Sequence, residues 1–360
     1  MTRAGSRYEV VFIEEPFYAD VPDSFLESTC EGKVNVLVPM LPERLYGADP
    51  APTLRHLLDG WLAPRRAGRT LLYWYYTPAA LAFSDPEDAD AVVYDNMDEL
   101  SQFKGADPAL VALEDELIAK ADLVFTGGQS LYDAKRHRHP SIHLFPSSID
   151  RDHFGRALAG PPEPADLAGL PRPRLGFFGV IDERLDLDLL SGLALARPDW
   201  TFVMIGPVVK ISEADLPAAP NIRWLGARPY ADLPAYLGHI DVGIMPFALN
   251  AATEFISPTK TPEFLAAGLP VVSTPIRDVV RPYGEKGLVR IAGDLAAFTA
   301  ECETAARTRD PAWQEAVRRH LAVMSWDRTW RAMQALIDGL RRTEPARAEV
   351  RPGRTGAHYV

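Results

Sequence analysis

One stretch of the sequence, residues 241–275, restricts the fold of this chain more than any other. It reads DVGIMPFALNAATEFISPTKTPEFLAAGLPVVSTP. The pattern predicts, in order, a short buried strand at 242–245, a polar loop at 249–261, a short helix at 263–267 and another strand at 269–273. Pro262 suits the first turn of that helix, and Gly268 is a typical residue at a helix end. We therefore expect a parallel crossover unit of an open α/β sheet.

The loop and the start of the helix carry groups that suit a nucleoside diphosphate. Open α/β sheets bind ligands at the carboxyl ends of their strands, where this loop should lie. Backbone N–H groups at the helix start and the nearby cation Lys260 suit phosphate, and Glu263 can accept two hydrogen bonds from a ribose diol. An ordinary crossover with a capped helix explains the same pattern, so these residues alone leave both interpretations open.

The run SPTKTPEFLAAGLPVVST resembles the donor-site signature of retaining glycosyltransferases of the GT-B fold, of the large family four type. In that family a Glu at the position of Glu263 contacts the donor ribose, and the loop before it holds the diphosphate. Many members carry two Glu residues here, but the spacing of Glu254 and Glu263 departs from theirs. The chain fits the Ser-Pro-x-Lys form of the loop better. The resemblance implies a donor-binding set from this stretch that consists of Glu254, Ser257, Thr259, Lys260 and Glu263.

Composition predicts a folded protein that does not bind nucleic acid. The 360 residues are 47% hydrophobic and 24% charged, which suits about two domains. A net charge of −11 argues against nucleic acid, because that partner needs a basic surface. Cys30 and Cys302 give neither a disulfide framework nor a metal-ligand spacing. No signal peptide or membrane-spanning run is evident. We expect a soluble cytoplasmic protein, which could lie at the inner face of the membrane.

The resemblance also implies a domain plan. We expect an α/β fold of the GT-B type, in which two Rossmann-like, doubly wound domains face a cleft. Residues 1–165 would bind the acceptor and residues 166–324 the nucleotide-sugar donor. The segment 160–173 is rich in Pro, Gly and Ala and suits a linker. Residues 325–340, with a Ser-Trp-Asp start, resemble the helix that crosses back to the first domain, and 341–360 would be a flexible tail.

In the first half, acidic residues follow the predicted strand at 91–94. Asp95, Asp98 and Glu99 lie just past its end, where mutual repulsion could raise a pKa and supply a base. The alternative is that Asp95 or Asp98 caps a helix. Similar glycosyltransferases have a Tyr-Asp-x-x-Asp-Glu stretch that faces the cleft, so Asp95 and Asp98 are the candidate catalytic residues. The departing phosphate is a third candidate for the base.

In the second half, a glycine turn follows the predicted strand at 174–178. In relatives such a turn approaches the donor phosphates, and a basic residue after it pairs with them. Gly179, Arg184 and Gly206 are therefore predicted to bind the donor, and a surface salt bridge is the alternative role for Arg184. The motif Asp186-Leu187-Asp188 looks like a metal-binding Asp-x-Asp, but it opens a predicted helix, where acidic residues favour the dipole. We expect no metal.

The family resemblance implies retaining glycosyl transfer from a nucleoside-diphosphate sugar, UDP more readily than GDP, to a glycan or lipid-linked acceptor. Similar proteins build surface polysaccharides, including teichuronic-acid-type polymers. No further cofactor is expected. A nucleotide-sugar epimerase and a non-catalytic nucleotide-sugar-binding protein are the alternatives. A dehydrogenase is disfavoured because no Gly-x-Gly-x-x-Gly follows Ile13 or Phe178. The basic residues at 65–69 and in the tail suggest a weak peripheral contact with anionic lipid.

Overall fold

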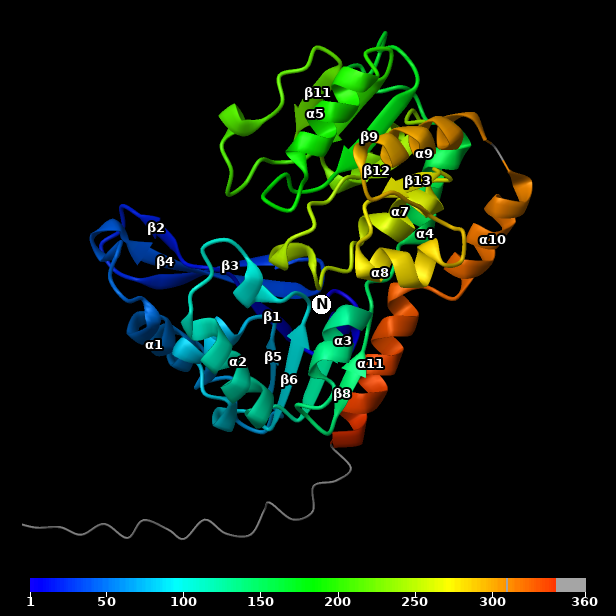
Figure 1. Cartoon of the computed structure of the whole chain (residues 1–360). Helices are drawn as coiled ribbons and strands as arrows, with labels where there is room; N and C mark the ends of the chain where they lie inside the picture. The colour runs from blue at the N-terminus through cyan, green and yellow to red at the C-terminus, as the bar shows by residue number, and fades with distance from the viewer. Residues whose placement is uncertain (309, 341–360) are drawn as a thin grey trace, which may run out of the picture.

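The computed structural model of the chain describes residues 1–308 and 310–340 and divides their strands among three hydrogen-bonded sheets. Two sheets belong to the first half of the chain and one to the second (Figure 1). The parallel sheets with helices around them confirm the predicted α/β class. The predicted flexible tail at 341–360 lies outside the described residues.

The second half contains one parallel sheet in the order β11-β10-β9-β12-β13-β14. Its strands are β9 (Arg174–Phe178), β10 (Thr201–Ile205), β11 (Ile222–Gly226), β12 (Val242–Met245), β13 (Val271–Ser273) and β14 (Arg290–Ile291). Its helices are α4 (Arg151–Gly155), α5 (Leu187–Ala196), α6 (Leu233–Leu237), α7 (Lys260–Ala266), α8 (Arg277–Val279), α9 (Leu295–Arg307) and α10 (Pro311–Ala322). Every residue of β9, β10, β12 and β13 is buried, as expected for a parallel sheet that helices cover on both faces.

A glycine in the central strand β12 determines how closely α7 approaches the sheet. A Cβ at Gly243 would lie 2.8 Å from the Phe264 ring, so only glycine lets this ring pack flat on the strand. Phe264 is fully buried and contacts Phe178 at 4.8 Å between ring centroids. This packing fixes α7, and with it the two charged residues Lys260 and Glu263.

The first half contains a parallel sheet in the order β5-β6-β7-β8. Its strands are β5 (Leu72–Tyr75), β6 (Ala91–Asn96), β7 (Leu123–Thr126) and β8 (Ile142–Leu144). One face packs with α2 (Ala109–Lys120), whose Leu117 lies beside Tyr94 in the core. The helix α3 (Gln129–Lys135) connects β7 to β8. Both helices contribute charged side chains to the region at the end of β6.

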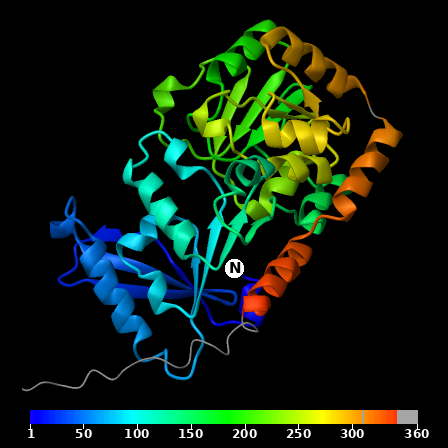
Figure 2. The same ribbon diagram turned by 60° about the horizontal axis from the view of Figure 1, so that its bottom comes forward.

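The other face of this sheet packs against the last described helix, α11 (Trp326–Leu340), which runs from the second half back to the first (Figure 2). Its Ile337 is buried with Val93 and Phe125. The core of the second half in turn includes Ile149 and Phe154, which precede the predicted domain boundary at 165/166. The chain therefore crosses between the halves at two places, and the exact boundaries stay a prediction.

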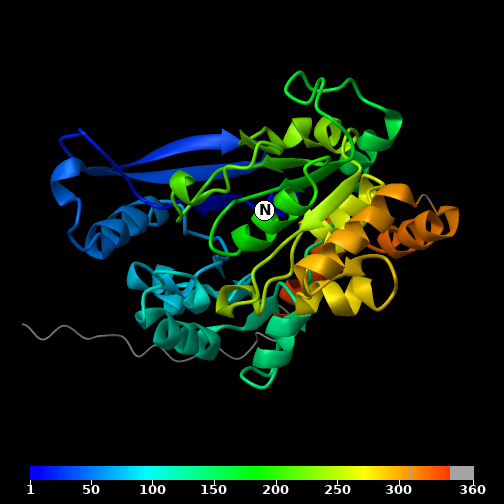
Figure 3. The same cartoon turned by 45° about the horizontal axis from the view of Figure 1, so that its top comes forward.

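A second sheet of the first half contains strands that the sequence did not predict. It consists of β1 (Val10–Ile13), β2 (Phe17–Ala19), β3 (Phe25–Glu31) and β4 (Val34–Pro42), followed by α1 (Ala51–Leu62). Within this sheet β3 pairs with β4 as an antiparallel hairpin, seen in blue in Figure 3. Most side chains of β3 are exposed, so it has no buried apolar pattern to detect.

No helix within 1–308 or 310–340 combines the length and the apolar character that crossing a membrane would require.

Candidate functional site

A cavity of about 150 Å³ lies between the two halves, just beyond the carboxyl ends of β6, β9 and β12. This is the edge at which open parallel sheets bind ligands. Its lining residues come from both halves: Met97, Asp98, Ser147, Val180, Arg184, Phe247, Ile256, Ser257, Pro258, Thr259 and Lys260. The cavity therefore brings together Asp98, Arg184, Ser257, Thr259 and Lys260, which the sequence had placed at the donor or catalytic site.

Lys260, the first residue of α7, places a cation at this cavity. Its side chain passes over Gly179, where a Cβ would overlap it and where φ is +125°. The ammonium lies 5.4 Å from the Phe177 ring centroid and 5.9 Å from that of Phe247. Burial, and then the neighbouring Arg184, lower the pKa of Lys260. Within the described part of the chain this ammonium forms no hydrogen bond or ion pair, so it can receive an anion.

Arg184 supplies the second cation. Its Nη2 donates to Asp182 Oδ2 at 2.6 Å, and its Nε donates to Oδ1 of the same carboxylate at 3.0 Å. Asp182 is buried, so the pair is not a surface salt bridge, which was one of the two predicted roles. A ring from the first half, Phe103, lies 5.4 Å from the guanidinium carbon. Arg184 is thereby held in place while it still lines the cavity.

The structure separates the two glutamates of the signature stretch. Glu263 lies one turn beyond Lys260 on α7, half-buried and without a hydrogen-bond partner among residues 1–308 and 310–340. Burial raises the pKa of Glu263 to about 7, although Lys260 opposes the shift. Glu254 follows the short helix Ala251–Thr253 and is exposed. Neither glutamate lines the cavity. Glu263 shares α7 with the cavity-lining Lys260 and is half-buried, so it is the better placed of the two to contact a ligand.

Gly206, which was predicted to bind the donor, does not line the cavity. A Cβ at this position would overlap the Gly179 carbonyl, and φ of Gly206 is +150°. The two glycines let the turns after β9 and β10 pack against each other. Gly206 therefore supports the Gly179 turn over which Lys260 passes.

The two candidate catalytic aspartates face different environments. Asp98 lines the cavity; burial raises its pKa, and the positive charges of Arg184 and Lys260 oppose the shift. Asp95 is 4% exposed and accepts a hydrogen bond from Trp74 Nε1 at 3.1 Å. Burial raises the pKa of Asp95 to about 6. Asp95 belongs to β6, where alternate side chains face opposite sides of the sheet, and it does not line this cavity.

A contact between the halves beside the cavity was not predicted. The carboxylate of Asp278 accepts hydrogen bonds from Ser130 N at 3.0 Å and from the Ser130 hydroxyl. A Cβ at Gly128 would overlap Asp278 and lie 2.9 Å from Ser257 Cβ, so glycine is needed for this approach. Nothing in the sequence around Ser130 points to a partner 148 positions away.

The Asp-x-Asp motif has a structural role at its first residue. Asp186 is the N-cap of α5, and its side chain accepts a hydrogen bond from Leu189 N at 2.8 Å. In the parts of the chain that the structure covers, no group of three or more His, Cys, Asp or Glu side chains is placed to hold a metal ion. The motif is therefore explained as a helix cap, and the metal-independent reaction stays a prediction.

Comparisons with known proteins point to glycosyltransferases. Residues 172–307, which contain the six-stranded sheet, match the family model described as "Glycosyl transferases group 1". The chain is 28% identical over 289 residues to a Bacillus subtilis (strain 168) protein described as a teichuronic acid biosynthesis glycosyltransferase, TuaH. That alignment covers 75% of this chain and 72% of the relative.

Solved structures extend the likeness to both halves. A sucrose-phosphate synthase from Thermosynechococcus elongatus superposes with a TM-score of 0.70 at 14% identity, covering 95% of this chain and 91% of the other. An E. coli structure described as trehalose-6-phosphate bound with UDP-2-fluoro glucose gives 0.66 at 14% identity, with 95% of each chain covered. At this identity the likeness shows the fold alone, which is the GT-B fold expected from the sequence.

Proposed function

This chain is a glycosyltransferase, and we propose that it transfers a sugar from a nucleoside-diphosphate donor to a glycan or lipid-linked acceptor. We further propose that the donor is a UDP-sugar more readily than a GDP-sugar, that the anomeric configuration is retained and that no metal is needed. The observation that carries the proposal is Lys260, a cation at the cavity wall without an anionic partner in the described residues. Such a charge is stabilised once an anionic ligand enters.

The chemistry follows from the two cations. When the bond between the sugar C1 and the diphosphate oxygen breaks, its electron pair stays on the phosphate, and negative charge grows there. Lys260 and Arg184 would stabilise this charge as it develops, which is how preorganised donors accelerate a reaction. The acceptor oxygen forms the new bond to C1, and its proton moves to Asp98 or to the departing phosphate. Asp98 is the better placed of the two predicted aspartates because it lines the cavity.

The relatives suggest the substrates. The E. coli structure holds UDP-2-fluoro glucose, which supports UDP ahead of GDP. The Bacillus protein is described by its part in teichuronic acid biosynthesis, which supports a surface polysaccharide or its lipid-linked precursor as acceptor. A lipid-linked acceptor would bring a cytoplasmic enzyme to the inner face of the membrane. Any lipid contact through the basic residues 65–69 would compete with the ion pair between Arg69 and Glu9.

Calorimetric titration with UDP and GDP, in the presence of a chelator, tests the donor site. It should be run at pH 8 so that Glu263 is ionised. We expect UDP to bind the wild type, and Glu263→Gln to raise its Kd about tenfold or more, the scale of a hydrogen bond to a charged group. The matched control, Glu254→Gln, should leave the Kd within about twofold because Glu254 is exposed and lies outside α7, the helix that carries Lys260.

If neither nucleotide binds, or if the two glutamate variants bind alike, the donor site is misplaced. Retention is tested separately, by NMR of the anomeric proton in the first product formed from donor and acceptor. An inverted product would contradict the retaining reaction without affecting the assignment of the donor site.

A further inference from the structure

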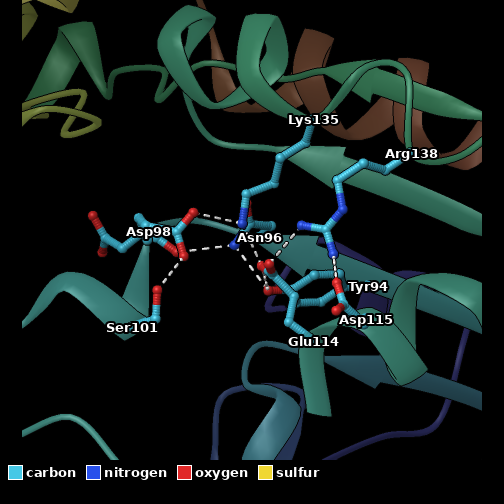
Figure 4. A network of polar contacts seen from close by, with 9 residues as sticks. Tyr94, Asn96, Asp98, Ser101, Glu114, Asp115, Lys135 and Arg138 are labelled. Carbon is cyan, nitrogen blue, oxygen red and sulfur yellow. Dashed lines mark hydrogen bonds and ion pairs between the residues drawn. The ribbon is translucent and has the colours of Figure 1, made fainter. Parts of the chain in front are cut away.

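We propose that Lys135 is a positioning residue for the transfer reaction, which acts through Glu99 to hold segment 97–104 and places Asp98 at the cavity. The inference rests on the proposed function, in which Asp98 faces the acceptor hydroxyl. Lys135 is the last residue of α3, lies in the first half and does not itself line the cavity. Its connection to Asp98 runs through a buried network of charged and polar side chains (Figure 4).

Lys135 joins two carboxylates inside the first half. Its side chain is 4% exposed, and Nζ lies 2.7 Å from Glu99 Oε2 and in direct contact with Glu114 Oε1. Glu114, on α2, also accepts from Tyr94 Oη at 2.9 Å and from Arg138 Nη1 at 2.9 Å. The helices α2 and α3 are thus fixed to each other, and Glu99 ties segment 97–104 to both.

Further hydrogen bonds hold the same segment near Asp98. Asn96 Nδ2 donates to Tyr94 Oη at 2.8 Å and to the Asp98 carbonyl at 2.9 Å. The Ser101 hydroxyl donates to Glu99 Oε1 at 2.8 Å. The two oxygens of Glu99 therefore have separate partners, one in α3 and one within the segment, which fixes the orientation of the carboxylate.

The far end of the segment reaches the second half. The Phe103 ring lies 5.4 Å from the Arg184 guanidinium carbon and 4.9 Å from Lys210 Nζ. The backbone N–H of Lys104 donates to Glu183 Oε1 at 3.3 Å. A shift at Glu99 would therefore move Asp98 and also change the ring that packs on Arg184.

The choice of a buried ion pair points to positioning rather than to stability alone. Apolar side chains of similar volume would often stabilise such a site equally well, because desolvating both charges offsets much of their attraction. Charge-assisted hydrogen bonds, in contrast, fix distance and direction. The hydrogen bonds of Lys135 fix Glu99 and so hold segment 97–104 in place. Asp98 belongs to this segment and lines the cavity.

The test compares two variants that each remove one partner of the network. Glu99→Ala cuts the link to segment 97–104, whereas the matched control Arg138→Met removes a contact of Glu114 that does not involve the segment. Hydrogen exchange of 97–104, the Kd for UDP, and kcat and KM for UDP-sugar turnover are measured for both, after urea unfolding shows that both are folded. Glu99→Gln, which keeps one acceptor oxygen, serves as the conservative variant.

We expect Glu99→Ala to speed exchange across 97–104 and to lower kcat about 10- to 100-fold, as small misplacements of reacting groups do. The Kd for UDP should stay within about threefold, since Lys260 and Glu263 are untouched and the ion pair with Asp182 still holds Arg184 when the Phe103 ring shifts. Arg138→Met should leave exchange and kcat near wild type, and Glu99→Gln should recover part of the lost kcat. If the network served only to stabilise the fold, Glu99→Ala and Arg138→Met would change exchange and kcat to a similar extent.

Two results would overturn the inference. One is unchanged kcat in Glu99→Ala despite faster exchange, and the other is an equal loss of kcat in Arg138→Met. If the wild type neither binds UDP nor turns over a donor, the proposed function fails instead. The hydrogen-exchange data then test by themselves whether Glu99 holds segment 97–104 in place. Equal exchange in Glu99→Ala and wild type would refute this.

Discussion

The two halves of the molecule each contain a buried or half-buried lysine, and the two lysines have opposite surroundings. In the first half Lys135 lies between the carboxylates of Glu99 and Glu114. In the second half Lys260 faces two aromatic rings and, in the described residues, no carboxylate partner. The first charge is neutralised inside the protein, so it organises structure. The second has no such partner in the described residues, which is why we propose it as part of the donor site.

The largest expected effect is the loss of folding stability when Lys135 is replaced. Lys135→Met leaves the buried Glu114 and the half-buried Glu99 without their shared cation, so the free energy of unfolding should fall by about 3–5 kcal/mol. Urea unfolding measures it. The control is Lys120→Met, which removes an exposed ion pair with Glu116 and should leave the unfolding curve unchanged. Equal stability of the Lys135 variant and wild type would mean that the network is not buried as described.

The second largest effect is expected at Lys260, where ligand binding is lost and stability is not. Lys260→Met should weaken UDP binding about 10- to 100-fold, the scale of a charge-assisted hydrogen bond, while stability holds or rises because an unpaired charge leaves the interior. Calorimetry and urea unfolding on the same preparation give both values. A variant that unfolds more easily yet binds UDP normally would show that Lys260 serves structure, and the contrast between the two lysines would disappear.

The smallest effect concerns the pH dependence of stability. The pKa of Glu263 is raised from 4.5 to about 7 in the folded chain, so this carboxyl contributes stability below pH 4.5 that is lost as pH rises through about 7. Glu263→Gln removes that dependence. The difference in unfolding free energy between Glu263→Gln and wild type should therefore shift by about 1–3 kcal/mol in favour of the variant between pH 4 and pH 8. Urea unfolding from pH 4 to 8 checks this, and parallel curves for the two proteins would contradict it.

Local patterns in the sequence predicted the second half well. The strand, loop and helix of 241–275 are present, although α7 begins at Lys260 instead of 263. Boundaries of this kind depend on backbone geometry, which residue patterns define only to within a few residues. Ser257, Thr259 and Lys260 reached one cavity with Arg184 because strand ends of a parallel sheet share an edge.

The first half was predicted less completely, for two physical reasons. The strand β3 is mostly exposed and leaves no apolar pattern, so the hairpin was missed. Contacts such as Lys135 with Glu99, or Asp278 with Ser130, join residues far apart in sequence and cannot be inferred from either position. Asp95 and Asp98 looked equivalent in sequence, but only the folded chain shows that one faces Trp74 and the other faces the cavity.

The contact at Gly128 has a consequence for how far apart the two halves lie. Because a Cβ there would overlap Asp278 and approach Ser257, a missing methyl group sets the closest approach of the halves beside the cavity. The methyl group of an alanine at 128 would push Asp278 and Ser257 away from the first half. Engineering of acceptor range could therefore begin at this position, where one added carbon would displace the cavity-lining Ser257 without replacing any residue that lines the cavity.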